Sequence, residues 1–354
     1  MHAFVTGAGG LIGSNLVREL CARGLAVRAM VRDAGCAGAR IDARAEICVG
    51  DLFDAPQEMA NRMRGCELVF HAAAYFAYAG VDEAQLQRTA GEGTRNVLAA
   101  AAAAGVQRVV VTSSSVVFGS SPSPAARDET CAPDPGFAEP PYVRSKILQS
   151  ELALAQAAEL GLEVVLACPT MSLGYPAAAL GPSNAIVVSY LSDPLRMTYP
   201  GGCNLVSVRD VAHGHWLVAT RGRPGESYLL GSENLSWRKI HGLIAELCGT
   251  DGPRAEVGHA VAYLGASYEE LRATVAKRAP ITTRAQARMI GRYYWYSHAK
   301  AAALGYAPRP ARTALAEACA CLAASRHVSR ETRAGLRLHP EVHAARASAG
   351  AAWS

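Results

Sequence analysis

Apolar residues in the first half of the chain form short runs, separated by longer segments in which they recur at helical spacing. Short runs rich in β-branched residues are typical of buried strands, and recurrence every three or four residues is typical of helices. Their alternation predicts βαβ units around a parallel sheet. The predicted strands are 2–6, 26–31, 46–49, 68–73, 108–113 and 163–168, and the predicted helices are 11–23, 55–64, 83–104 and 142–160.

Glycines mark several of the predicted helix ends. Gly24, Gly105 and Gly161 each follow a helical pattern, where a residue free to adopt positive φ can close the last turn. The first half of the chain is therefore predicted to be a doubly wound α/β domain.

The second half of the chain has a looser pattern. Beyond Pro169, glycine and proline turns separate a predicted helix at 209–220, a strand at 226–231 and a helix at 237–247. We expect residues 1–168 to form mainly a dinucleotide-binding domain. Residues 169–325 would form mainly a smaller C-terminal substrate-binding lobe, with some segments returning to the first domain. Residues 326–354 show no sustained periodicity and are predicted to be a disordered tail.

Residues 6–13, which read TGAGGLIG, follow the first predicted strand and open the first predicted helix. Gly7, Gly10 and Gly13 allow a tight turn, close approach of the backbone to a pyrophosphate, and close packing of helix on strand. The N–H groups at the start of the helix would face the phosphates. A purely structural turn could use the same glycines, but in this position the motif predicts a dinucleotide site.

The end of the second predicted strand bears on which dinucleotide binds. The segment VRAMVRD places Arg32 at the strand end and Asp33 next to it. A guanidinium suits the 2'-phosphate of NADP, so the sequence favours NADP(H). The alternative is that Arg32 is an ordinary surface arginine and that Asp33 binds the ribose of NAD(H).

Composition and charge narrow the classes of function. The net charge is +5, but five arginines lie in the last 29 residues, and no basic stripe with interleaved aromatics exists, so we expect no nucleic-acid partner. No apolar run is long enough to span a membrane, and the N-terminus lacks the features of a secretory signal. The sequence therefore predicts a cytoplasmic protein.

The cysteines and histidines do not predict a metal site. Ten cysteines are scattered without a CxxC pair, which is typical of buried thiols in a reducing compartment. His213 and His215 are two residues apart, so on a helix they would point in different directions.

Several further motifs occur in a fixed order along the chain: GDLFD at 50–54, FHAAA at 70–74, EGTRNVLAAA at 92–101, VTSSS at 111–115, YVRSK at 142–146, VSVRDVA at 206–212 and LGYAPRPARTAL at 304–315. With the glycine motif and Pro169, they resemble an extended short-chain dehydrogenase/reductase of the NAD-dependent epimerase/dehydratase superfamily. The resemblance covers roughly residues 1–323 and implies a Rossmann fold. The most similar subgroups are dihydroflavonol-reductase-like, 3β-hydroxysteroid-dehydrogenase-like and hopanoid-associated sugar-epimerase-like proteins.

The resemblance implies specific cofactor contacts. Asp51 would hold the adenine amino group beside Leu52, and the strand end from His71 to Ala74 would lie along the cofactor. Ala90 is a departure, because similar proteins often have an asparagine there, and one polar contact to the cofactor is lost. The implied cofactor residues are Gly7, Gly10, Leu11, Ile12, Gly13, Arg32, Asp51, Leu52, Ala72, Ala73, Ala74, Tyr142, Lys146 and Pro169.

Tyr142 and Lys146 lie four residues apart, so on a helix they project from one face. The resemblance makes them a proton-transfer pair, in which the ammonium and the nicotinamide cation lower the pKa of the phenol. The same family places a catalytic hydroxyl five residues before a glycine, and counting back from Gly119 gives Ser114, with Ser113 as the alternative. Chance spacing on a helix and serines that only satisfy backbone groups are the structural alternatives.

Three functions fit this fold: an NAD(P)H-dependent ketone reductase acting on a fairly apolar metabolite, an NAD-dependent nucleotide-sugar epimerase or dehydratase, and a sensor without catalysis. A sensor would be expected to lack the Tyr–Lys pair. Residues 168–192 contain no charged side chain, whereas a buried nucleotide diphosphate needs basic partners. We therefore predict an oxidoreductase for a small-molecule ketone or alcohol, with the epimerase as the alternative.

The predicted substrate residues come from three segments of the chain. They are Tyr75, Phe76, Tyr78, Ser115 and Met171, where aromatic and apolar side chains suit a ring or an acyl chain. Core packing is the structural alternative for at least one of these aromatics. Helices 83–104 and 142–160 carry apolar surface that could support a homodimer, as in many similar proteins.

Overall fold

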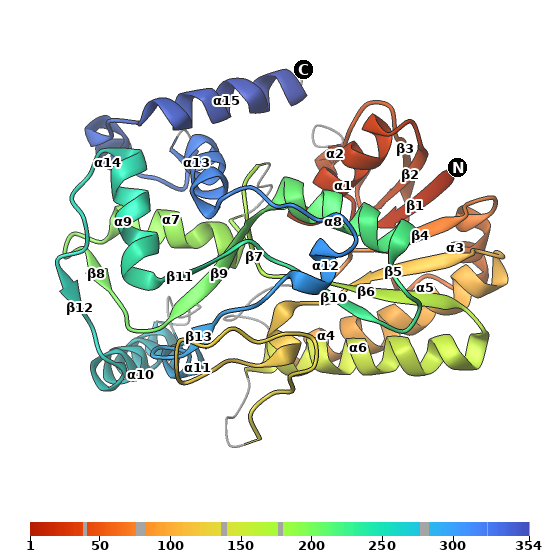
Figure 1. Cartoon of the computed structure of the whole chain (residues 1–354), viewed down its shortest axis with the longest axis horizontal. Helices are drawn as coiled ribbons and strands as arrows, with labels where there is room; N and C mark the ends of the chain where they lie inside the picture. Colours follow the sequence, from red (N-terminus) through yellow and green to blue (C-terminus); the bar gives the residue numbers. More distant parts are fainter. Residues whose placement is uncertain are drawn as a thin grey trace.

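The computed structural model describes residues 1–37, 41–75, 82–135, 140–175, 180–276, 283–323 and 325–353. A large parallel sheet with helices on both faces occupies one half of the molecule, and a smaller lobe built mostly from the C-terminal half lies beside it (Figure 1). The predicted elements at 209–220, 226–231 and 237–247 form, with ends shifted by one residue or so.

The main sheet has seven strands in the order β10-β6-β5-β4-β1-β2-β3, and every neighbouring pair is parallel. This arrangement confirms the predicted α/β fold. The order reverses between β1 and β4, and ligands bind at such a point in open α/β sheets. The strands are β1 (His2–Thr6), β2 (Ala26–Val31), β3 (Glu46–Val49), β4 (Leu68–His71), β5 (Arg108–Thr112), β6 (Glu163–Pro169) and β10 (Ser227–Leu230).

Alternate residues of the central strands serve two separate hydrophobic cores. In β1, Val5 belongs to the core with α1 (Leu11–Ala22) and α8 (Val208–Arg221), whereas Phe4 belongs to the core on the opposite face. That second core includes residues of α3 (Pro56–Met63), α5 (Thr94–Ala103) and α6 (Pro141–Leu160). Because strand side chains alternate between faces, a strand buried on both sides reads as one continuous apolar run.

The predicted helix at 83–104 is interrupted. It consists of α4 (Glu83–Arg88), a π-helical turn (Thr89–Gly93) and α5. Gly93 lies against Leu52, and a Cβ atom there would be 3.1 Å from the Leu52 Cδ1 atom. The wider turn thus brings the backbone close to the segment after β3, a contact that helical periodicity alone does not predict.

The smaller lobe is built on a second sheet with the order β11-β9-β13, in which β7 also pairs with β9. Its strands are β7 (Met171–Leu173), β9 (Gly202–Ser207), β11 (Glu233–Ser236) and β13 (Tyr293–Tyr294), and β8 (Met197–Thr198) pairs with β12 (Ala255–Glu256). The remaining helices are α2 (Ala34–Ala37), α7 (Pro182–Ser192), α9 (Trp237–Cys248), α10 (His259–Val275), α11 (Arg284–Arg288), α12 (Ala299–Ala302) and α13 (Ala311–Leu322).

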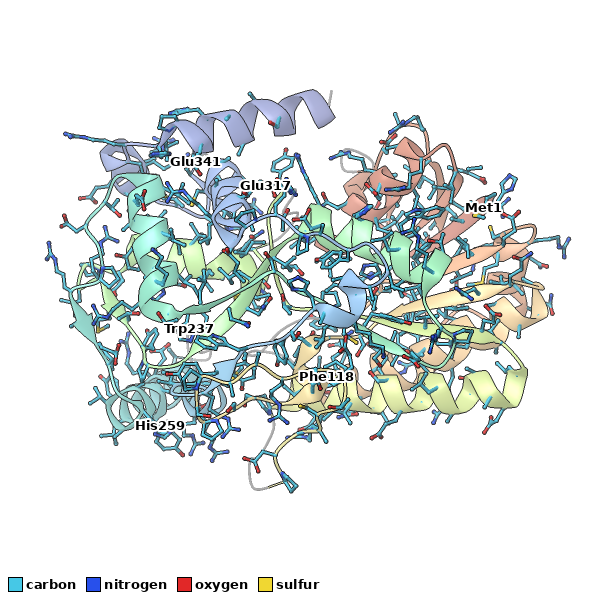
Figure 2. All side chains as sticks on the ribbon, viewed as in Figure 1. Met1, Phe118, Trp237, His259, Glu317 and Glu341 are labelled. Carbon is cyan, nitrogen blue, oxygen red and sulfur yellow. The ribbon has the colours of Figure 1, made fainter. Side chains whose placement is uncertain are left out.

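The prediction of a disordered tail at 326–354 is wrong for the described residues. They form α14 (Arg330–Gly335) and α15 (Pro340–Trp353), and α15 packs on α13. Val328 and Val342 are almost completely buried. Glu341 lies at the start of α15 (Figure 2), and its carboxylate pairs with the Arg312 guanidinium at 2.9 Å. The apolar residues are split among two short helices and a loop, so the sequence shows no sustained period.

Within the described part of the chain, no helix is both long enough and apolar enough to cross a membrane.

Gly24, Gly105 and Gly161 all have positive φ at helix ends, as predicted.

Candidate active site

The glycine-rich turn connects β1 to α1 through a backbone that only glycine fits. Gly7 has φ +67°, and a Cβ atom there would lie 2.6 Å from the backbone of Ala73. A Cβ atom at Gly13 would collide with the carbonyl oxygen of Gly7. The helix starts after Gly10 without a side-chain cap, so its first N–H groups can bind an anion. Leu11 and Ile12, the first two helical residues, are half-buried.

The predicted adenine contacts lie after β3. Asp51 is half-buried, and its carboxylate accepts a hydrogen bond from the backbone N–H of Phe53 at 3.0 Å. Leu52 is buried, and its carbonyl oxygen accepts from the Asn96 side chain at 2.9 Å. This loop is therefore fixed to α5, and it lies at the same carboxyl edge of the parallel sheet as the glycine turn.

Arg32 and Asp33 follow β2 directly, and both are exposed. One oxygen of the Asp33 carboxylate accepts a hydrogen bond from the backbone N–H of Gly35 at 2.8 Å. One of the two carboxylate oxygens of Asp33 is therefore already engaged in a hydrogen bond within its own turn.

The chain after β4 runs past the glycine turn. The backbone N–H of Ala73 donates to the hydroxyl of Thr6 at 3.2 Å, which holds the two segments together. Ala72 and Ala73 are half-buried, and Ala74 is exposed. This path places the predicted Ala72–Ala74 segment beside the glycine turn, and Pro169, at the end of β6, is buried.

Tyr142 and Ser114 are brought together by different elements. Ser114 precedes the short 3-10 helix Ser115–Phe118, and Tyr142 is the second residue of α6. The two side chains are hydrogen-bonded, and both are buried. Ser113 points elsewhere, because its hydroxyl is 2.6 Å from that of Ser150. Of the two serines considered from the sequence, the structure brings Ser114 to the tyrosine.

Burial dominates the electrostatics of the pair. Burial raises the pKa of Tyr142 to about 12, while the hydrogen bond from Ser114 opposes that rise. Burial lowers the pKa of Lys146 to about 8. The lysine charge is not among the causes that act on Tyr142, so the protein alone does not produce the lowered phenol pKa expected from the sequence.

The ammonium of Lys146 is held on two sides. It donates to the carbonyl oxygen of Thr112, at the end of β5, at 3.0 Å and to the Gln149 side chain at 2.8 Å. An ammonium group has three N–H donors, so one is left for another acceptor. Lys146 and Gln149 also line a small cavity with Ala73, Ala74, Tyr75, Leu86, Thr89, Ala90 and Ser145.

The predicted substrate residues are only partly described. Tyr75 lines the cavity and is 39% exposed, Met171 is half-buried in β7, and Ser115 is buried. Phe76 and Tyr78 lie outside the described residues. Phe118, which packs in the core near the middle of the molecule, ends the 3-10 helix that carries Ser115 (Figure 2).

Thr94 and Gln149 were not predicted as site residues, and His71 was predicted only as part of the strand end along the cofactor; all three are buried polar residues. His71, the last residue of β4, ends its apolar run, and this polar residue in a buried strand was the available signal. His213 and His215 point in different directions: His213 contacts Glu19 at 3.0 Å, whereas His215 contacts the Thr112 hydroxyl at 2.9 Å. Within the described ranges, no group of His, Cys, Asp or Glu side chains is placed to hold a metal ion.

Comparison with known proteins agrees with this geometry. The model of the NAD-dependent epimerase/dehydratase family matches residues 3–231, which include the glycine turn, Ser114, Tyr142 and Lys146. The chain is a member of this family. It is an NAD(P)-dependent enzyme of the extended short-chain dehydrogenase/reductase type.

Relatives of this family member include reductases. The chain is 32% identical over 320 residues to a putative dihydroflavonol 4-reductase of Synechocystis sp., covering 89% of this chain and 92% of that one. It is 32% identical to 4-hydroxy-2-methyl-3-oxo-4-farnesyl-3,4-dihydroquinoline-1-oxide ketoreductase of Stigmatella aurantiaca, covering 87% and 92%. The crystal structure of the protein gox2253 superposes with a TM-score of 0.81 at 30% identity, covering 92% and 99%.

Proposed function

We propose that this family member reduces the ketone of a fairly apolar small molecule with NADPH, or oxidises the corresponding alcohol with NADP+. The observation that carries the proposal is the buried contact between Tyr142 and Ser114, one helical turn from Lys146. The absence of charged side chains in residues 168–192 supports an uncharged substrate. The relative from Stigmatella aurantiaca, whose name specifies an oxo group and a farnesyl chain, supports an apolar ketone.

In this mechanism the hydroxyls of Ser114 and Tyr142 donate hydrogen bonds to the substrate carbonyl oxygen. When bound, NADPH would supply the hydride for the carbonyl carbon. Tyr142 gives its proton to the oxygen, and the phenolate that remains is stabilised by its hydrogen bond from Ser114. The reaction converts a ketone, NADPH and a proton into an alcohol and NADP+, so atoms and electrons balance.

We propose NADP(H) rather than NAD(H) as the cofactor because of the residues after β2. The exposed Arg32 guanidinium can pair with a 2'-phosphate, whereas one carboxylate oxygen of Asp33 already accepts from Gly35. The uncapped start of α1 suits the pyrophosphate.

The test starts from the purified protein. After gel filtration, an absorbance spectrum detects retained nucleotide, and titration with NADPH and NADH gives the two dissociation constants. Turnover is then followed at 340 nm with dihydroquercetin, a dihydroflavonol, and phenanthrenequinone, an apolar dicarbonyl. Exchangeable NADPH binding with micromolar affinity and oxidation of NADPH by either compound support the reductase. Stoichiometric NAD+ retained through gel filtration, with no NADPH oxidation, would overturn it in favour of an epimerase.

A further inference from the structure

A chain of buried hydrogen bonds runs behind Lys146, away from Tyr142. It begins at Gln149, whose side-chain oxygen accepts from the Lys146 ammonium at 2.8 Å. The Gln149 amide nitrogen donates to the Thr94 hydroxyl at 3.2 Å, and that hydroxyl is also 3.2 Å from His71 Nε2. His71 Nδ1 is 2.8 Å from the hydroxyl of Thr6, the residue before the glycine turn.

Every member of this chain is at least 96% buried, and they come from four elements. Thr6 ends β1, His71 ends β4, Thr94 starts α5, and Gln149 and Lys146 lie on α6. Buried polar groups are costly unless they are paired, so each hydrogen bond restrains its neighbours. The chain connects the cofactor turn to the lysine through side chains alone.

The chain also fixes which way the Gln149 amide points. The Thr94 hydroxyl accepts from the amide nitrogen, so the amide oxygen is left facing Lys146. Burial of His71 lowers its pKa to about 3, with Lys146 as the second cause, so the imidazole is neutral and adds no charge beside the ammonium. The Gln149 side-chain oxygen is therefore held in place as an acceptor for the buried Lys146 ammonium. In the described part of the chain, the ammonium has only one other protein acceptor, the carbonyl of Thr112.

We propose that Gln149, which Thr94 and His71 orient, is a positioning residue. The Gln149 oxygen and the Thr112 carbonyl oxygen each accept from one of the three N–H groups of Lys146. The third N–H group is thereby aimed at the cofactor. This inference rests on the proposed function, in which Lys146 binds the nicotinamide ribose. Gln149 also lines the small cavity beside Lys146, but the role proposed for it acts through Lys146.

The experiment compares Gln149→Met with Gln149→Glu. Methionine keeps the length of the side chain and removes the acceptor, whereas glutamate keeps an acceptor and adds a negative charge. The dissociation constant of NADPH is measured from pH 6 to pH 10 for both variants and for the wild type, with melting temperatures as the folding control. The same measurements on Thr94→Val and Thr94→Ser test whether the hydroxyl behind Gln149 matters.

We expect Gln149→Met to weaken NADPH binding about tenfold at pH 7, since the ammonium loses one of its two protein acceptors in the described part of the chain. Its binding should also decline at a lower pH than in the wild type. Gln149→Glu should bind NADPH within about threefold of the wild type at pH 7 and keep binding to a higher pH, because a carboxylate stabilises the ammonium. Thr94→Val should shift binding in the direction of Gln149→Met, and Thr94→Ser should behave as the wild type.

The inference is overturned if both Gln149 variants shift the alkaline decline in the same direction, or if Gln149→Met binds NADPH as the wild type does at every pH. Turnover by Tyr142→Phe tests the proposed function separately. If that variant loses turnover while Gln149→Met binds normally, the reductase proposal stands and the positioning role fails.

Discussion

The cofactor side and the substrate side of the candidate site are built by different means. On the cofactor side, Gly7 and Gly13 sit where any side chain would meet backbone, and buried hydrogen bonds join Thr6 to Lys146. On the substrate side, Tyr75 and Met171 come from chain segments next to loops and are partly exposed.

The difference shows what each side requires of the sequence. The pyrophosphate and the nicotinamide ribose are the same in every NAD(P) enzyme, so their side is fixed by backbone geometry, which demands glycine at particular positions. A substrate is recognised by side-chain shape, and many side chains can fill one shape. Changes on the cofactor side should therefore affect every substrate, and changes on the substrate side only some.

The largest effect is expected from Tyr142, which is predicted to contact both the cofactor and the substrate. Tyr142→Phe removes the proton donor and should lower kcat for NADPH-dependent ketone reduction by about 10²- to 10⁴-fold, the usual contribution of a general acid. The NADPH dissociation constant should change less than about threefold, because other residues hold the cofactor. Turnover at 340 nm and NADPH titration check both values. Loss of NADPH binding together with turnover would place Tyr142 in the cofactor site alone.

Gly13→Ala should be the most damaging change on the cofactor side. Its Cβ atom would collide with the Gly7 carbonyl, and overpacking of this kind costs about 1–3 kcal/mol. We expect a lower melting temperature and NADPH binding weaker by at least tenfold, measured by thermal unfolding and titration. Gly242→Ala is the matched control, because its site in α9 is open, and it should leave both values unchanged or raise the melting temperature. Equal behaviour of the two variants would contradict the steric argument.

Arg32→Ala tests the choice between the two dinucleotides. If the guanidinium pairs with the 2'-phosphate, NADPH binding should weaken about tenfold while NADH binding stays the same. The ratio of the two dissociation constants is the measurement. An equal loss for both dinucleotides would assign Arg32 a role outside phosphate recognition.

Lys146 makes the cofactor side sensitive to pH. Its pKa of about 8 lies below the ordinary lysine value because of burial, so its ammonium is present at pH 7 and is lost as the pH rises through about 8. The value of kcat/KM for NADPH should therefore fall above pH 8, since this parameter reports groups of the free enzyme. Lys146→Arg, which stays charged, should show no decline in that range. A wild-type profile that is flat up to pH 9.5 would contradict the assignment.

The smallest effect is expected on the substrate side. Tyr75→Ala removes a half-exposed ring, and we expect KM for phenanthrenequinone to rise about two- to fivefold while NADPH binding is unchanged. Steady-state kinetics and NADPH titration give the two values. A larger loss of NADPH affinity than of substrate affinity would move Tyr75 to the cofactor side.

The bounds of those elements that depend on their own sequence pattern were predicted closely. The strands at 2–6, 26–31 and 46–49 have the predicted bounds, because short apolar runs between helical patterns indicate strands, although 46–49 is an edge strand whose side chains are mostly exposed. The interruption of 83–104 and the helices after Ser325 could not be predicted, since they depend on packing against Leu52 and α13.

The candidate site was only partly predictable. The spacing of Tyr142 and Lys146 is local to one helix, and it led to the pair that the structure places on α6. Gln149 and Thr94 lie 55 residues apart, and the contacts of Thr94 with Gln149 and with His71 exist only in the folded protein. In the sequence, the only signal for these contacts was that single polar residues occur inside otherwise apolar helices and strands.

The most direct measurement is the ionisation of Tyr142 with and without NADP+. Difference absorbance at 295 nm between the wild type and Tyr142→Phe isolates this phenol from the other tyrosines. Without NADP+ its pKa should lie near 12, as burial dictates. Saturating NADP+ should lower the pKa by about two units or more, because the nicotinamide cation is brought beside the phenol. An unchanged or higher pKa with NADP+ would contradict the role of Tyr142 as the proton donor.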